Sequence, residues 1–573
     1  MFHSTSLRVS RAIRASKVIH SSPLRGPRSK VRQLTTASIK SAHNNKLLPA
    51  LGFLGASASI AALLLNNTEP FIRLDAPTQG PLYTPDDVSA HNTKDDLWVV
   101  LNGKVYDLTE FLPNHPGGQR IILKYAGKDA SKIFNPIHPP DAIDKYLPPE
   151  KCIGTLDGEF PEEEEVLSDE ELLRLDRVDR KPPLSKIMNL HDFEAVARQI
   201  LPPGALAYYS SAADDEITLR ENHNAYHRIF FNPKVLVDVS KVDITTEFLG
   251  NETSAPFYIT ATALAKLGHP DGEVSIARGA GKEDITQMIS TLASCSFDQI
   301  ADARVKDTQA QWYQLYVSED RELSKKQLKH CEERGMKGIF ITVDAPSLGR
   351  REKDMKLKFE GNADVQSDDD IDRSQGAAVA LSSFIDSSLT WKDITEIRKW
   401  TKLPIVIKGV QRKEDVLLAL EHGCDGVVLS NHGGRQLDFS RAPVEVLAEV
   451  MPILREKGVD KKFEVYVDGG VRRGTDVLKA LCLGAKGVGL GRPFLYANSA
   501  YGEKGVRRAI QLLKSELIMN MRLLGVTKIE DLTPELLDTT TIHQRTVSVP
   551  ADYLYKENYL HMQGVEFNPE LEE

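Results

Sequence analysis

Eight short apolar runs recur between Pro256 and Gly491, and stretches of helical character separate them. The runs cover residues 256–260, 287–291, 311–316, 338–344, 403–408, 426–430, 463–467 and 487–491. Strands that alternate with helices favour a parallel sheet covered by helices, and eight such units predict a closed α/β barrel of the (β/α)8 or TIM type. A doubly wound sheet is the competing fold, but its usual Gly-x-Gly-x-x-Gly turn after the first strand is absent.

Polar residues gather at or just beyond the carboxyl ends of these runs. They are Thr262, Ser290, Gln314, Tyr316, Thr342, Asp344, Lys408, His432 and Asp468. Because the active sites of such barrels lie at the carboxyl ends of the strands, the pattern predicts one mouth that collects these side chains.

The stretch 430–438, Ser-Asn-His-Gly-Gly-Arg-Gln-Leu-Asp, directly follows the apolar run at 426–429. It places His432, a proton acceptor, three residues before Arg435, a cation that can bind a carboxylate. A base and an anion anchor this close together indicate catalysis on a substrate that carries a carboxylate.

Glycine turns that each carry an arginine follow the last two runs. They contain Asp468, Gly469, Gly470 and Arg472 in the first turn, and Gly491 and Arg492 in the second. Barrels commonly bind phosphate after strands seven and eight. One such turn could simply be a tight strand-to-helix connection, but two in this order favour a phosphorylated cofactor.

Five further motifs accompany the base and phosphate motifs. They are Ala-Tyr-Tyr-Ser-Ser at 207–211, Trp-Tyr-Gln-Leu-Tyr at 312–316, Thr-Val-Asp-Ala-Pro at 342–346, Gly-Arg-Arg-Glu at 349–352 and Ile-Lys-Gly at 407–409. From Leu190 to about Tyr553 the chain therefore resembles the FMN-dependent 2-hydroxy-acid dehydrogenase and oxidase family.

This resemblance implies a role for each residue of the mouth. His432 is the base, Asp344 orients it, and Tyr316 binds the substrate hydroxyl. The substrate carboxylate is bound by Arg351 and Arg435, with Tyr208 as a further donor. Lys408 lies beside the flavin and stabilises its reduced form. The other FMN-binding residues are Thr262, Ala263, Ser290, Gln314, Thr342, Asp468, Gly469, Gly470, Arg472, Gly491 and Arg492.

Two histidines mark a second, smaller domain. A predicted hairpin whose turn is Asn102-Gly103 comes first. His115 then lies in His-Pro-Gly-Gly, and His138 follows 23 positions after His115. Either histidine alone is more often an ordinary loop residue. Together they make residues 83 to about 156 resemble a cytochrome b5 domain, which implies an α+β fold and a haem b whose iron has two histidine ligands and transfers electrons.

The amino end has the composition of a mitochondrial transit peptide, because no acidic residue precedes Glu69 while arginine, lysine and serine recur. An uncharged run at 47–65 follows and is just long enough to cross a bilayer. The order resembles a bipartite sorting signal, which implies release into the mitochondrial intermembrane space. A permanent transmembrane anchor is the alternative.

These observations divide the chain into five predicted segments. They are a transit and sorting segment at 1–80, a haem domain at 81–158, an acidic hinge linker at 159–187, the barrel at 188–545 and a tail at 546–573. The linker could instead be a docking patch. Residues 353–375 lack apolar period and are expected to form a mobile loop, either a lid or a proteolytic weak point. The tail resembles family tails that wrap neighbouring subunits, which implies a homotetramer.

Charge and cysteine content exclude some classes of protein. A net charge of -9 argues against a nucleic-acid partner but is compatible with a basic protein partner. The five scattered cysteines support neither a zinc site nor a disulfide framework, so reduced and mostly buried thiols are expected.

The combined resemblance implies an FMN- and haem-dependent enzyme that oxidises L-lactate to pyruvate and passes electrons singly through the haem to cytochrome c. Glycolate, longer-chain 2-hydroxy acids and mandelate remain alternative substrates, because Ala263 and Leu292 match family positions that line the side-chain pocket without specifying one acid. An oxygen-using oxidase, a flavin-dependent isomerase and a non-catalytic haem module are the alternative classes. Whether His432 takes the α-carbon proton or the hydroxyl proton stays open.

Overall fold

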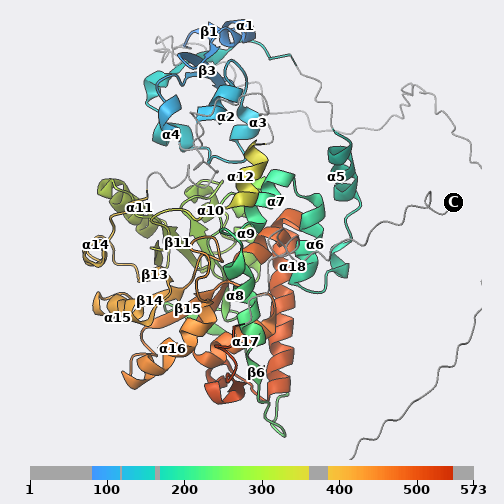
Figure 1. Ribbon diagram of the computed structural model, residues 1–573, viewed down its shortest axis with the longest axis vertical. Coiled ribbons are helices and arrows are strands. Elements are labelled where there is room, and N and C mark those ends of the chain that lie inside the picture. The colour runs from blue at the N-terminus through green and yellow to red at the C-terminus, as the bar shows by residue number, and fades with distance from the viewer. Residues whose placement is uncertain (1–79, 116–118, 162–167, 360–384, 546–573) are drawn as a thin grey trace, which may run out of the picture. The chain divides into compact units, whose positions relative to one another are not determined.

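The computed structural model describes residues 80–115, 119–161, 168–359 and 385–545. A small α+β domain comes first in the chain and an α/β barrel follows it (Figure 1).

The small domain is built on a five-stranded sheet of order β1-β5-β4-β3-β2. Its strands are β1 (Leu82–Tyr83), β2 (Asn92–Thr93), β3 (Asp96–Leu101), β4 (Lys104–Asp107) and β5 (Cys152–Leu156), and its helices are α1 (Pro85–Ser89), α2 (Gln119–Lys124), α3 (Ser131–Phe134) and α4 (Ala142–Tyr146). The predicted hairpin is confirmed, since β3 and β4 pair antiparallel with Leu101 opposite Lys104. Asn102 and Gly103 have φ of 52° and 78°, as a two-residue hairpin turn with left-handed residues requires.

The barrel closes from eight parallel strands, and every predicted run supplies one of them (Figure 1). The strands are β9 (Phe257–Ile259), β10 (Gln287–Ser290), β11 (Gln311–Leu315), β12 (Ile339–Thr342), β13 (Ile405–Val410), β14 (Gly426–Leu429), β15 (Glu464–Asp468) and β16 (Gly487–Leu490). Consecutive strands are neighbours, and β16 pairs with β9 to close the ring.

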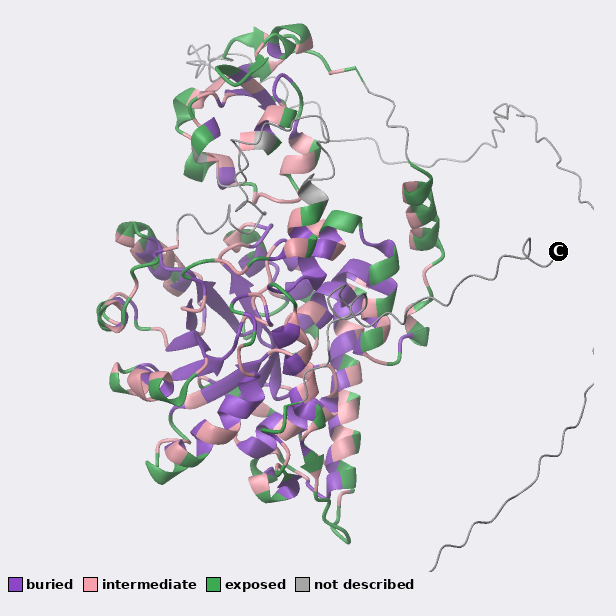
Figure 2. Cartoon of the chain, in the orientation of Figure 1, coloured by how far each residue is buried: buried purple, intermediate pink, exposed green. Residues whose placement is uncertain are grey.

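Helices surround the strands and cover their outer face (Figure 1). Those before the barrel are α6 (Leu190–Ile200), α7 (Pro203–Ser210) and α8 (Ile217–His227); those that follow strands are α9 (Gly272–Lys282), α10 (Phe297–Asp302), α11 (Arg321–Glu333), α14 (Trp391–Ile397), α15 (Lys413–Glu421), α16 (Pro443–Glu456), α17 (Gly474–Leu483) and α18 (Arg492–Leu524). Aromatic side chains fill the barrel interior, where Trp312 stacks on Phe340 with ring centroids 4.5 Å apart. Because both faces of each strand are buried (Figure 2), the strands read as continuous apolar runs rather than as alternating patterns.

Two segments predicted to be irregular contain helices. Residues 353–359, predicted to belong to a mobile loop, lie in α12 (Glu352–Phe359), which contacts α7. Tertiary packing stabilises this helix, which has no strong apolar period of its own. The predicted linker contains α5 (Asp169–Asp179), whose amide at Glu171 is capped by the Ser168 side chain. Acidic residues in its first turn favour the helix through the helix dipole. The acidic residues that predicted a linker therefore stabilise the start of a helix.

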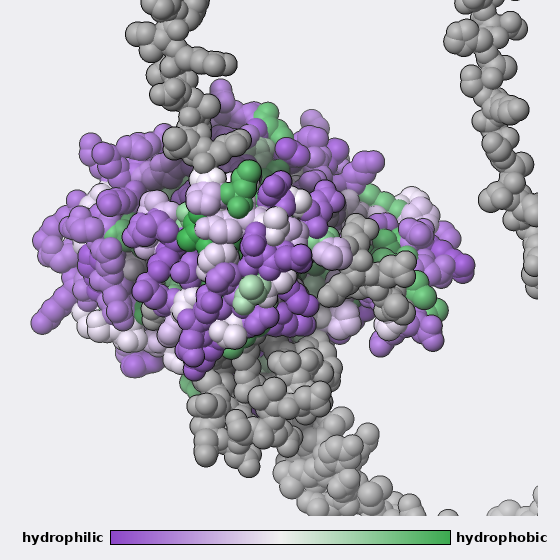
Figure 3. Space-filling view, turned by 90° about the horizontal axis from the view of Figure 1, so that it is seen from above, coloured by the Kyte–Doolittle hydropathy of each residue, from purple (hydrophilic) through white to green (hydrophobic). Residues whose placement is uncertain are grey.

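Several predictions fall outside the described residues. These are the transit peptide, the apolar run at 47–65, the rest of the predicted loop from 360 to 375 and the tail. Among the helices that are described, none is long and apolar enough to span a bilayer. All five cysteines are free thiols, four of them buried, as predicted. The face in Figure 3 is mostly hydrophilic, and its hydrophobic residues form small separate groups.

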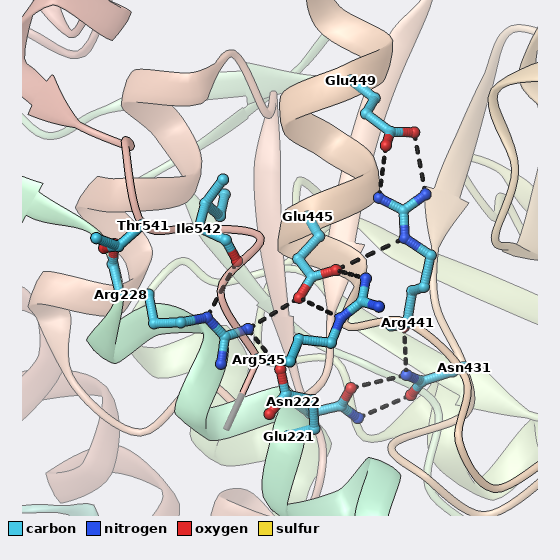
Figure 4. Close-up of polar contacts among 10 residues, drawn as sticks. All are labelled: Glu221, Asn222, Arg228, Asn431, Arg441, Glu445, Glu449, Thr541, Ile542 and Arg545. Carbon is cyan, nitrogen blue, oxygen red and sulfur yellow. Dashed lines mark hydrogen bonds and ion pairs between the residues drawn. The ribbon is translucent and has the colours of Figure 1, made fainter. Parts of the chain in front are cut away.

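A buried carboxylate joins the two ends of the barrel domain's sequence. The side chain of Glu445, in the first turn of α16, is fully buried and binds Arg228 at 2.8 Å (Figure 4). Arg545 also pairs with Glu445, and Arg441 lies 3.6 Å from it. Arg228 in turn donates to the backbone oxygen of Ile542 at 3.0 Å. The end of α8 and the segment before residue 546 are thereby held against α16.

Glu445→Gln should lower the stability of the barrel by about 2 kcal/mol, because it removes the buried negative charge that Arg228, Arg441 and Arg545 share, although Arg228 keeps Glu221 and Arg441 keeps Glu449. The measurement is the urea unfolding midpoint, followed by tryptophan fluorescence. Glu449→Gln is the matched control, since the Glu449–Arg441 pair is partly exposed and should cost at most about 1 kcal/mol. Equal shifts in the two variants would contradict the assignment.

Candidate active site

The carboxyl ends of the barrel strands surround one cavity, and almost every residue predicted for the site lines it. The predicted residues that line it are Tyr208, Thr262, Ala263, Ser290, Gln314, Tyr316, Thr342, Arg351, Lys408, His432, Arg435, Asp468, Gly469, Gly470, Arg472, Gly491 and Arg492. Leu292, predicted for the substrate side-chain pocket, lines it too. Asp344 lies behind His432, with a side chain only 1% exposed. The structure therefore brings all of these residues together.

A row of hydrogen-bonded polar side chains runs across β10, β11 and β12. Ser290 Oγ donates to Gln314 Oε1 at 3.3 Å, and Gln314 Nε2 donates to Thr342 Oγ1 at 3.0 Å. Thr342 pairs in register with Lys408 on β13. Equal register of parallel strands thus places these polar groups at one level, where they can face the edge of a planar ring.

Lys408 is a buried ammonium group at the same level. Its Nζ lies 3.4 Å from Asp468 Oδ2 and donates to Ser430 Oγ at 3.2 Å. Burial alone would lower the pKa of Lys408, but Asp468 and Asp344 hold that pKa above its ordinary value. Next to Lys408 the register shifts, and Gly409 has a φ of 104°. A side chain at residue 409 would collide with Asp344, so this glycine allows the lysine and the aspartate to lie side by side.

His432 and Asp344 form an imidazole–carboxylate pair, as predicted for a base and the residue that orients it. His432 Nδ1 lies 2.9 Å from Asp344 Oδ1, which leaves Nε2 as the nitrogen that can accept a proton. Burial alone would raise the pKa of Asp344, but the charge and hydrogen bond of His432, with Lys408 nearby, hold it below its usual value. His432 has a φ of 58°, a left-handed conformation that costs most residues roughly 1–2 kcal/mol.

Two arginines flank one tyrosine at the cavity wall. The guanidinium carbons of Arg435 and Arg351 lie 4.9 Å and 5.6 Å from the centre of the Tyr208 ring. Arg435 Nη1 also donates to the Tyr208 backbone oxygen at 2.8 Å. Burial raises the pKa of Tyr208 and that of Tyr316, so both hydroxyls remain neutral donors. The arrangement presents two cations and neutral hydroxyls to a small anion.

The glycine turn after β15 packs closely against α8 and ends a strand whose last residue, Asp468, faces the cavity. Gly469 and Gly470 have φ of 98° and 81°, and a Cβ at Gly470 would lie 2.0 Å from the Asn222 backbone oxygen. Asp468 Oδ1 is buried and has no hydrogen-bond partner within the described part of the chain. A ligand with hydroxyl groups would satisfy this oxygen, as the ribityl chain of FMN can. These observations agree with the predicted flavin site.

Arg492 binds backbone oxygens with all three of its guanidinium nitrogens. It donates Nε to the Tyr209 oxygen at 2.9 Å, Nη1 to the Gly433 oxygen at 2.8 Å and Nη2 to the Ser211 oxygen at 2.9 Å. Burial lowers its pKa. Arg492 therefore ties the end of α7 to the turn that carries His432, and its contact with phosphate stays a prediction.

The small domain brings its two predicted iron ligands together. The rings of His115 and His138 have centroids 6.2 Å apart, a spacing that accommodates one metal atom between them. His138 Nδ1 lies 3.2 Å from the Phe134 backbone oxygen, which leaves Nε2 for a metal. Burial lowers the pKa of His138 to about 4, so its imidazole is neutral at pH 7, as a ligand must be.

Ser430 and Asn222 are buried residues beside the site that were not assigned a role from the sequence. Ser430 accepts from Lys408 Nζ and, at 3.0 Å, from the His432 amide. Ser430 ends the apolar run at 426–430, so the pattern of polar residues at strand ends, which predicted Lys408 and His432, could have predicted Ser430 as well. Asn222 lies on α8, and its side chain pairs with Asn431 beside His432. The pattern of polar residues at strand ends could not predict Asn222, because this residue lies on a helix outside the barrel.

Comparison with known proteins identifies two family models in the chain. Residues 197–539 match the FMN-dependent dehydrogenases, and residues 84–157 match the cytochrome b5-like heme/steroid binding domain. An L-lactate dehydrogenase (cytochrome) of Wickerhamomyces anomalus is 72% identical over 519 residues, which cover 90% of each chain. The L-lactate dehydrogenase (cytochrome) of Saccharomyces cerevisiae is 58% identical over 528 residues, 88% of each chain.

A solved structure agrees with these relatives. It is a doubly substituted flavocytochrome b2 with pyruvate bound, which matches with a TM-score of 0.63 and 59% identity over 70% of this chain and 99% of that one. The cavity that fits FMN and the histidine pair that fits haem each lie within the matching family region. From these sites and similarities we conclude that the chain belongs to the FMN-dependent dehydrogenase family, carries a cytochrome b5-like domain before the barrel, and has FMN and haem b as its cofactors.

Proposed function

We propose that this chain is a cytochrome-linked L-lactate dehydrogenase, which oxidises L-lactate to pyruvate and passes the electrons to cytochrome c. The observation that carries the proposal is the convergence of the His432–Asp344 pair with Arg351 and Arg435 in one cavity, beside the buried ammonium of Lys408. The activity for which the relatives are named and the pyruvate in the matching structure support it.

Substrate binding in this proposal uses charge and hydrogen bonds together. Arg351 and Arg435 bind the carboxylate of L-lactate, and the Tyr208 hydroxyl donates a further hydrogen bond. Tyr316 contacts the substrate hydroxyl. Because Arg435 is fixed by its bond to the Tyr208 backbone, it loses little side-chain freedom when the anion binds.

His432 accepts one of the two protons that the oxidation releases, and the other hydrogen would leave with both electrons as a hydride to FMN or separately as a proton to FMN or water. His432 Nε2 takes its proton, and Asp344 stabilises the imidazolium that results, because the carboxylate is buried, negatively charged and 2.9 Å from Nδ1. L-lactate loses two protons and two electrons in becoming pyruvate. The proposal holds whether His432 takes the proton from the α-carbon or from the hydroxyl.

Bound FMN would supply a two-electron acceptor, and bound haem b would supply a one-electron relay. Lys408 places a positive charge at the ring level, where negative charge develops on reduction. The residues proposed to hold FMN are those of the polar row and the glycine turns, and those proposed to hold the haem iron are His115 and His138. An iron held by two imidazoles, those of His115 and His138, would favour electron transfer over oxygen binding.

Anaerobic addition of L-lactate to the holoenzyme tests the function. The flavin absorbance should bleach while the reduced haem bands appear, and added cytochrome c should then be reduced. Bleached flavin with unchanged haem would instead indicate an oxygen-using oxidase. The ratio of kcat/KM among L-lactate, glycolate and mandelate ranks the substrates.

The same measurement separates the base from the rest of the site. In His432→Gln the rate of flavin bleaching should fall by about 10²–10⁴-fold while FMN stays bound. His422→Gln is the matched control, because His422 follows α15 on the outside of the barrel and contacts Thr395. Near-normal bleaching in His432→Gln would remove His432 from the mechanism.

Acid should weaken the haem domain through His138. The folded state holds the pKa of His138 at about 4, against 6.5 ordinarily, so the unfolded chain takes up the proton first on acidification. The stability of the haem-free protein's small domain should be complete above pH 6.5 and fall by about 3 kcal/mol as the pH drops towards 4. Urea midpoints at pH 7, 5.5 and 4.5 measure this. In His138→Leu the pH dependence should be clearly flatter, and an unchanged slope would argue against the assignment.

We also propose a homotetramer in the mitochondrial intermembrane space. The acid-free basic amino end supports import, and a loop with exposed Val235 and Leu236 supports self-association. Fractionation of mitochondria should release the protein with the soluble intermembrane fraction, and light scattering should then give four times the mass of the processed chain. Recovery with membranes after salt washing would refute the location in the intermembrane space, and a monomer mass would refute the tetramer.

A further inference from the structure

The turn that carries the base has a backbone that needs support. His432, Gly433 and Gly434 have successive φ values of 58°, 66° and 80°. Three left-handed residues in a row are not a conformation that the chain adopts by itself, so contacts outside the turn must fix it. Two contacts are already described, the Arg492 bond to the Gly433 oxygen and the Ser430 bond to the His432 amide.

A buried pair of amides supplies the third and most complete contact. Asn222 and Asn431 are each 1% exposed, and each donates its Nδ2 to the other's Oδ1 at 2.7 Å (Figure 4). Asn431 Oδ1 also accepts from the Gly434 amide at 3.0 Å, and its Nδ2 donates to the Arg441 oxygen at 3.0 Å. Both hydrogens and both lone pairs of the Asn431 amide are therefore used.

The helix that carries Asn222 is itself fixed by the same loop and by the glycine turn. Asp438, six residues after the base, accepts from the Thr218 amide at 2.7 Å and so caps the start of α8. His223 Nδ1 lies 2.8 Å from the Gly470 oxygen, and the Asn222 amide nitrogen lies against Gly469. Asn222 thus lies where the base turn and the proposed phosphate turn meet.

We propose that Asn222 is a positioning residue for the base: it holds the left-handed turn so that His432 stays aligned with Asp344 and with the substrate. The inference rests on the proposed role of His432. Without the Asn222 amide, two buried hydrogen-bonding groups of Asn431 lose their partner. The turn can then relax, and a displacement of the base on the order of 1 Å costs about 10²-fold in rate.

Three variants test the proposal in the FMN- and haem-loaded full chain. Asn222→Ser removes both hydrogen bonds, and Asn222→Asp sets a carboxylate oxygen against Asn431 Oδ1. Asn224→Ser is the matched control, because Asn224 is the same residue type on the same helix and is only half-buried. The readout is the anaerobic rate of flavin bleaching by L-lactate, expressed per bound FMN, together with KM and the isotope effect for lactate deuterated at its α-carbon.

The Asn222 variants should bleach about 10–100-fold more slowly per bound FMN, with KM changed less than about threefold, because Arg351 lies on another segment and Arg435 keeps its own bonds to the Tyr208 and Ser211 oxygens. The isotope effect should stay equal to or exceed that of the parent, whereas a loss of active molecules alone would leave the rate per bound FMN unchanged. Asn224→Ser should match the parent, which also shows that the lactate reaction itself is intact.

Pairing with Asn431 gives a second criterion. Because Asn222 and Asn431 act as one unit, the double variant Asn222→Ser with Asn431→Ser should be no slower than the worse single variant within about threefold. Rates per bound FMN within about twofold of the parent in both Asn222 variants would overturn the proposal. If the two single-variant rate losses multiply in the double variant, Asn222 acts independently of Asn431, and the proposal is overturned. Loss of FMN from both Asn222 variants would also overturn it, since that result assigns Asn222 a structural role.

Discussion

The mouth of the barrel is organised around one buried cation. Transfer of an ammonium group from water to the end of a closed barrel is unfavourable unless negative charge and hydrogen-bond acceptors accompany it. Lys408 is 4% exposed, and Asp468, Asp344 and Ser430 supply what it needs. Asp344 then remains ionised and can orient His432. The buried charge of Lys408 thus requires acidic neighbours, and one of them, Asp344, in turn positions His432.

The same electrostatics explains why the site suits a 2-hydroxy acid. A carboxylate entering the cavity meets Arg351 and Arg435, whose guanidinium groups lie against the ring of Tyr208. Cations stacked on an aromatic face keep their charge available to an incoming anion. Asp344 and Asp468, by contrast, pair with His432 and Lys408, so neighbouring cationic or proton-binding groups offset their charge.

The sequence predicts the barrel well because its strands are buried on both faces. Each strand is a run of apolar residues, and polar groups are confined to the ends, so the position of Lys408 or Ser290 can be inferred from the run before it. The pair at His115 and His138 could be recognised because the spacing is specific. Asn222 could not, because a helix outside the barrel contributes it through tertiary packing. The helices α5 and α12 were missed because capping and packing, rather than apolar period, stabilise them.

The left-handed backbone at the base limits the replacements that a lineage could accept there. Histidine, asparagine and aspartate occur in this conformation several times more often than other residues that have a side chain, and asparagine is no base at neutral pH. A change to glutamate or lysine would have to reshape the backbone as well as the chemistry. The identity of residue 432 is therefore restricted twice, by proton transfer and by the geometry of its own peptide unit, and descendants of this chain are expected to change the substrate pocket long before they change the base.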